Sequence, residues 1–155
     1  MSTSGHVLTL YISWTLFLLV LMEARRSWLV ATHQVPANGF QPDNGNLSPF
    51  MQRLARAHAN CIEGFPIFGG LLIAALATDR AAVTDPLAPW LMLARVLQSG
   101  IHLASLSEFA VTARFTAFAV QMGIAAYWAW ALLARLAPTS RPGRRGAIGY
   151  TARCA

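Results

Sequence analysis

A polar stripe runs along one apolar segment of this 155-residue chain and consists of Arg53, Arg56, Asn60 and Glu63. These residues stand at positions i, i+3, i+7 and i+10, so on an α-helix they cover roughly 80° of one face. The surrounding sequence is apolar enough to lie in a membrane, where charged groups are costly unless they pair or line a polar cavity. The spacing therefore predicts a polar pocket inside a membrane protein.

A second stripe repeats this spacing further along the chain and consists of Arg95, Gln98, His102 and Ser105. On a third apolar segment, Arg114 and Gln121 lie seven residues apart and so share a helix face. Guanidinium groups supply several donors, an amide supplies both donors and an acceptor, and a neutral imidazole supplies one of each. A pocket of this composition suits a small anionic ligand that carries carboxylates.

Other kinds of site find little support in the sequence. The two Cys and four His residues show no metal-binding spacing such as CxxC or HExxH, so we expect no metal site. The formal net charge of +6 comes partly from arginines near the C-terminus. We therefore read the basic character as a property of this tail and expect no nucleic-acid partner.

Composition supports the membrane setting, because 55% of the residues are hydrophobic and only 12% are charged. Four apolar stretches come close to the roughly 20 residues that a spanning helix needs. We place these helices at about residues 7–32, 49–78, 86–106 and 109–136. The chain is therefore expected to be all-α, with one four-helix transmembrane domain over residues 1–137.

The connecting segments refine this expectation. Ser48 and Pro49 suit the N-cap and the first turn of the second helix. The short connection after residue 106 predicts that the third and fourth helices are antiparallel neighbours. Residues 138–155 are rich in Gly, Pro and Arg and are expected to form a basic disordered tail. The aromatic side chains of Tyr127, Trp128 and Trp130 are expected to mark a membrane interface.

The chain resembles the MAPEG superfamily, the membrane-associated proteins of eicosanoid and glutathione metabolism. The resemblance rests on RLARAHANCIEGFPIF, which holds the first polar stripe at the family's spacing, with support from EARR, RVLQSGIH and RFTAF. It covers essentially the whole chain except the tail. The resemblance implies an integral membrane four-helix bundle that assembles as a homotrimer, with glutathione sites at the subunit interfaces.

The resemblance also implies roles for individual residues. Arg114 matches the catalytic arginine that lies next to the glutathione sulfur. The implied glutathione-binding residues are Arg56, Asn60, Glu63, Gln98 and His102, together with Arg25 or Arg26. The resemblance does not decide between these last two arginines. Structural roles, or additional contacts, are left to Arg53, His58 and Arg95.

The implied function is that of a membrane-bound glutathione transferase or peroxidase. Such an enzyme activates the glutathione thiolate for conjugation to lipophilic electrophiles or for reduction of lipid hydroperoxides. Its partners would be membrane lipid and a lipophilic substrate, in a bacterial inner membrane or an intracellular membrane. Phe115 and Phe118 stand where relatives carry polar residues. A noncatalytic scaffold that binds lipid or thiol therefore remains an alternative, followed by a small channel or transporter.

Overall fold

The computed structural model describes residues 2–105 and 107–136, so the predicted tail at 138–155 lies outside the described residues. Within the described part the chain is helical and contains no strand, which confirms the all-α prediction. The helices are α1 (Thr3–Ala31), α2 (Pro49–Ala77), α3 (Ala81–Thr84), α4 (Ala88–Ala104) and α5 (Glu108–Leu136).

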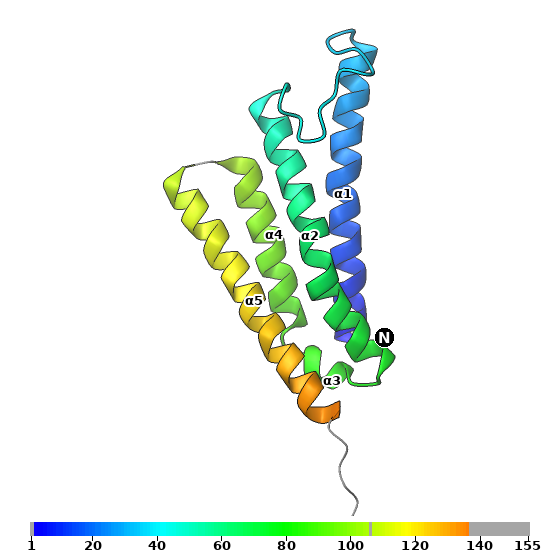
Figure 1. The fold of residues 1–155 in the computed structure, drawn as a ribbon, viewed down its shortest axis with the longest axis vertical. Helices are drawn as coiled ribbons and strands as arrows, with labels where there is room; N and C mark the ends of the chain where they lie inside the picture. Colours follow the sequence, from blue (N-terminus) through cyan, green and yellow to red (C-terminus); the bar gives the residue numbers. More distant parts are fainter. Residues whose placement is uncertain (1, 106, 137–155) are drawn as a thin grey trace, which may run out of the picture.

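The four longer helices run alternately up and down and lie side by side (Figure 1). The α1–α2 and α4–α5 connections lie at one end of the molecule, whereas the N-terminus and the short α3 lie at the other. Helices α4 and α5 form the most extensive contact, followed by α1 and α2. The prediction of antiparallel neighbours joined by a short connection is therefore confirmed.

Capping residues explain several helix ends. The Ser2 hydroxyl accepts a hydrogen bond from the Gly5 amide at 3.2 Å, so α1 begins at Thr3 rather than at residue 7 as predicted. The Ser48 hydroxyl accepts from the Met51 amide at 3.4 Å, which confirms the predicted N-cap of α2. The short α3 lies where the sequence predicted only a connection, and α4 begins two residues later than predicted.

The N-terminus of α1 is attached to the segment after α3. The Asp85 carboxylate accepts hydrogen bonds from the Ser4 amide at 2.7 Å and from the Ser4 hydroxyl at 2.6 Å. The Thr84 hydroxyl lies 2.6 Å from the same Ser4 hydroxyl. A carboxylate is favourable at a helix N-terminus because it satisfies free amide groups and faces the positive end of the helix dipole.

The largest buried cluster joins α1, α2, α4 and α5 around Tyr11, Phe68, Leu72, Leu91 and Trp128. Trp128 is 0% exposed, so the prediction that it marks a membrane interface is wrong for this residue. It faces the core because α5 packs on its neighbours through this face, whereas Tyr127 and Trp130 are exposed.

Three helices in the described part are long and apolar enough to cross a membrane, namely Thr3–Ala31, Pro49–Ala77 and the Glu108–Ala134 part of α5. Many large apolar side chains on these helices point outward, among them Leu16, Phe17, Val20 and Val120. A continuous apolar exterior of this extent is typical of contact with lipid or with another subunit rather than with water. The architecture is that of a membrane protein.

Candidate functional site

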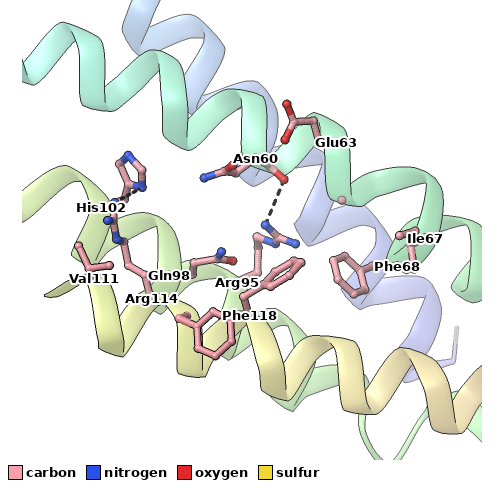
Figure 2. Close-up of a pocket in the computed structure, with 12 residues that line it drawn as sticks. Asn60, Glu63, Ile67, Phe68, Arg95, Gln98, His102, Val111, Arg114 and Phe118 are labelled. Atoms are coloured by element: carbon pink, nitrogen blue, oxygen red, sulfur yellow. Dashed lines mark hydrogen bonds between the residues drawn. The ribbon is translucent and has the colours of Figure 1, made fainter. Parts of the chain in front are cut away.

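A groove of about 400 Å³ opens between α2, α4 and α5. This volume lies in the usual range of small-molecule sites. The groove is lined by Asn60, Glu63, Gly64, Ile67, Phe68, Arg95, Gln98, His102, Val111, Arg114, Phe115 and Phe118. Members of both predicted stripes and Arg114 are thus brought to one place, although they come from three helices (Figure 2).

Arg114 and His102 form a pair across α4 and α5. Arg114 Nη1 is hydrogen-bonded to His102 Nδ1, and Figure 2 shows the two side chains pointing toward each other. A guanidinium can only donate, so His102 Nδ1 must accept and the imidazole carries its proton on Nε2. Arg114 makes no other hydrogen bond to the described residues, so its remaining donors are unpaired at the groove.

A second cavity of about 300 Å³ adjoins the groove and shares His102 and Arg114 with it. Its other lining residues are Pro49, Gln52, Arg53 and Arg56. Arg53 Nε donates to the Leu103 carbonyl at 2.9 Å, which ties α2 to the end of α4. Arg56 is exposed and has no partner among the residues that the structure describes. We call this cavity the cationic basin.

The first stripe therefore divides between the two spaces. Arg53 and Arg56 line the cationic basin, and Asn60 and Glu63 line the groove. The Glu63 carboxylate is exposed on the edge of the groove. A ligand that spans both spaces would meet cations at one end and a single carboxylate further along α2.

Gln98 is held in place by a neighbouring amide on α5. Gln121 Nε2 donates to Gln98 Oε1 at 3.0 Å and to the Ala117 carbonyl at 3.0 Å. Gln121 is fully buried and Gln98 nearly so, and Gln98 lines the groove. Because its oxygen is already paired, Gln98 is oriented to present its amide nitrogen to the groove.

Arg95 is almost fully buried and reaches from α4 toward α2 (Figure 2). Its Nη1 donates to the Asn60 carbonyl at 3.2 Å. The guanidinium carbon lies 5.4 Å from the centre of the Tyr11 ring and 5.1 Å from that of Phe68. Arg95 thus connects three helices, and it also lines the groove.

Three predicted site residues lie elsewhere in the structure. Arg26 donates to Asn44 Oδ1 at 2.6 Å and 3.0 Å and forms an ion pair with Glu23, so it holds the α1–α2 connection. Arg25 is exposed and does not line the groove. His58 faces a different, apolar groove of about 440 Å³ between α1 and α2.

Sequence reasoning missed four residues of the groove: Gly64, Ile67, Phe68 and Val111. Ile67 lies four residues after Glu63, and Val111 lies three residues before Arg114, so helical spacing could have found both. Gly64 is different, because its contribution is the absence of a side chain. Only the structure shows that a Cβ at this position would lie 2.6 Å from Arg95 Nη2.

No group of three His, Cys, Asp or Glu side chains in the described ranges lies close enough together to hold a metal ion. In a comparison with known protein families, the MAPEG family matches residues 5–134 of the chain. No curated protein and no solved structure matches the chain.

Proposed function

The chain belongs to the MAPEG family, and from this membership we propose that it is a membrane-bound glutathione transferase or peroxidase. The observation that carries the proposal is the position of Arg114. Its guanidinium lies where the cationic basin meets a groove that is apolar on its outer side, lined by Val111, Phe115 and Phe118. A thiol held at this junction would face a cation on one side and a lipophilic reactant on the other.

Glutathione carries two carboxylates, one ammonium group and one thiol. In the proposed complex, Arg56 binds a carboxylate in the basin, Glu63 binds the ammonium, and Asn60 donates to the peptide backbone. His102 Nε2–H and the Gln98 amide are further donors that face the same ligand. This assignment places opposite charges together and leaves the thiol beside Arg114.

The proposed chemistry follows from the charge of Arg114. A free thiol has a pKa near 8.5, and its thiolate is the nucleophile, so an adjacent fixed cation raises the reactive fraction at neutral pH. In conjugation, the thiol proton is released to water in the basin and the sulfur forms a bond to the electrophilic carbon. The bond from that carbon to its leaving group breaks at the same time, and the leaving group departs with the electron pair as an anion. In peroxide reduction, the sulfur attacks the terminal oxygen and the O–O bond breaks. The products are an alcohol and a sulfenic acid, which a second glutathione converts to the disulfide and water.

We further propose that the protein is a homotrimer of four-span subunits. Arg56 and Glu63 are exposed on a helix that is apolar and long enough to cross a membrane, and lipid cannot solvate such charges. A neighbouring copy would cover them. Helix α4 would be the fourth span, because its 17 residues give a length of about 25 Å. Since Arg26 is bound to its own α1–α2 connection, Arg25 is the arginine that we assign to a neighbouring site.

A noncatalytic scaffold is the second candidate, because Phe115 and Phe118 line the groove beside Arg114 and offer no donor to a thiolate. Phe115 is 70% exposed in the protomer. Such a protein would bind glutathione or lipid without lowering the thiol pKa.

Calorimetry with glutathione on detergent-purified protein, combined with the ultraviolet absorbance of the bound thiolate, separates these candidates. The enzyme proposal expects binding at millimolar glutathione or below together with a thiolate band. Binding without the band would favour the scaffold. Absence of binding would contradict both glutathione-based proposals.

A further inference from the structure

Arg95 has donors that no described residue uses. Its side chain is 1% exposed. Nη1 donates to the Asn60 carbonyl, but Nε and Nη2 have no hydrogen-bond partner. A buried polar group without a partner is rare in native proteins, and each one requires an explanation.

Arg95 also lacks a counterion. The one ion pair within residues 2–105 and 107–136 joins Arg26 to Glu23, far along the sequence from Arg95. Glu63 lines the same groove, but it is exposed and forms no ion pair with Arg95. The rings of Tyr11 and Phe68 offset part of the cost of burying the charge. The remaining cost is reduced when an anion enters the groove, because a buried charge is stabilised only by a well-placed partner.

The surroundings of Arg95 suit an anion at the end of an apolar molecule. Ile67, Phe68 and Phe118 supply apolar walls, and Gln98 adds one amide donor three residues along α4. The absence of a side chain at Gly64 makes room for Nη2, since a Cβ at this position would lie 2.6 Å from that nitrogen. Arg95 is thus held at the wall of the groove with two buried donors, Nε and Nη2, that have no partner.

We propose that Arg95 binds the carboxylate of the lipophilic substrate, with the reacting atom of that substrate held near Arg114. The position of the reacting atom rests on the proposed function, whereas the carboxylate site does not. His102 is hydrogen-bonded to Arg114 and therefore marks the position of the reacting atom along α4. Arg95 and His102 are seven residues apart on this helix, which corresponds to about 10 Å along the helix axis. The preferred substrate is thus an electrophile or hydroperoxide that carries a carboxylate about 10 Å from its reacting atom.

Glutathione itself has carboxylates, so the test must decide whether Arg95 binds a carboxylate of glutathione or that of the lipophilic substrate. The glutathione-dependent reduction of linoleic acid 9-hydroperoxide and of its methyl ester is compared in the purified full-length protein. We expect kcat/KM to favour the acid by roughly tenfold or more, as a hydrogen bond to a charged group allows. In Arg95→Gln this ratio is expected to fall close to one, and in Arg95→Lys part of it should return.

Arg80→Gln is the matched control, because Arg80 donates to the Leu132 carbonyl at 3.3 Å and does not line the groove. This variant should keep the wild-type ratio of acid to ester. Equal kcat/KM for acid and ester in the wild type would overturn the inference. An increased Kd for glutathione in Arg95→Gln, with the preference for the acid retained, would also overturn it and assign Arg95 to glutathione.

A binding measurement keeps the inference independent of catalysis. Nonanoate and nonanamide are titrated into the protein without glutathione. The wild type should bind nonanoate more tightly than nonanamide, whereas Arg95→Gln should bind the two probes equally. If the protein binds no glutathione yet shows this preference, the carboxylate site stands and the proposed function fails. Equal binding of the two probes overturns the carboxylate site, whatever the glutathione result.

A second variant addresses the case in which Arg95→Gln does not fold. Gly64→Ala keeps the charge of Arg95 but places a Cβ against Nη2, so the guanidinium must shift. We expect this variant to weaken nonanoate binding while the nonanamide affinity stays near that of the wild type. Unchanged nonanoate binding in a folded Gly64→Ala protein would contradict the proposed geometry.

Discussion

Two grooves of similar size border α2, one of about 400 Å³ against α4 and α5 and one of about 440 Å³ against α1. The first contains two arginines, one carboxylate, two side-chain amides and an imidazole. The second is lined mainly by aliphatic and aromatic side chains, with only Thr15 and His58 adding polar groups. The difference shows that volume alone does not identify a site in a membrane protein. Charges that need a partner are the more informative signal.

The same helix supplies both surfaces because α-helical spacing separates them. Asn60, Glu63 and Ile67 face the polar groove, whereas His58, Ile62 and Phe65 face the apolar groove. A shift of one or two positions along the sequence thus moves a side chain from one groove to the other. Substitutions in the polar groove and in the apolar groove can test this difference between the two surfaces.

The largest effect is expected for Arg114→Ala. Loss of the cation beside the sulfur should lower kcat for conjugation by about 100-fold, in line with the removal of one charge-stabilising donor from an active site. The ultraviolet thiolate band should disappear at the same time. If the variant keeps the wild-type kcat and the thiolate band, Arg114 has no part in the chemistry. The polar groove would then lose its proposed catalytic residue.

Arg56→Ala should have the next largest effect, on binding rather than on chemistry. Loss of one charged contact in the cationic basin is expected to raise the Kd for glutathione about tenfold. The kcat at saturating glutathione should stay close to that of the wild type. Calorimetry and steady-state kinetics measure the two effects separately, and an unchanged Kd would mean that Arg56 supports assembly instead.

Gln121→Leu is expected to act mainly on stability. It removes the donor to Gln98 Oε1 and leaves that nearly buried oxygen unpaired, at a cost of about 1 kcal/mol. Gln121 Oε1 has no partner, so its removal offsets part of this cost. Thermal unfolding in one detergent should show a lower Tm. A higher Tm would show that the unpaired Oε1 costs more than the two donated hydrogen bonds contribute.

The smallest effect is expected on the apolar side. Thr15 donates to the Tyr11 carbonyl at 2.9 Å within its own helix and has no role in the polar groove. Thr15→Val should change the free energy of unfolding by less than about 0.5 kcal/mol and leave the glutathione Kd unchanged. A loss of glutathione affinity would indicate that the apolar groove of one copy lies against the polar groove of another.

Much of the polar groove could be predicted because helical periodicity is a geometric property of the sequence. Arg95, Gln98 and His102 share a face wherever the helix lies, and the apolar surroundings required that this face be covered. Ser105 fits the same spacing but does not line the groove. It is the C-cap of α4, where its φ of −151° leaves the helix, so the periodicity no longer applies.

Other features could not be predicted, because they depend on tertiary contacts that helical periodicity does not determine. The hydrogen bonds from Arg26 to Asn44 depend on the fold of the α1–α2 connection, in which Asn44 adopts a φ of 55° and lies buried. The burial of Trp128 depends on how α5 packs against α4 and α2. The position of the Arg95 guanidinium depends on the register of α2 against α4, which places Gly64 opposite that side chain.

The hydrogen bonds between Ser4 and Asp85 bear on how the protein is made. The two residues are 81 positions apart, so Asp85 has not yet been synthesised when α1 leaves the ribosome. When α1 leaves the ribosome, the Ser2 hydroxyl is present to accept from the Gly5 amide, but the Ser4 amide still lacks its partner. The N-terminus of α1 becomes fixed only after α2 and α3 have also been synthesised. The start of the chain is thus held by a segment that is synthesised much later, at the end of α3.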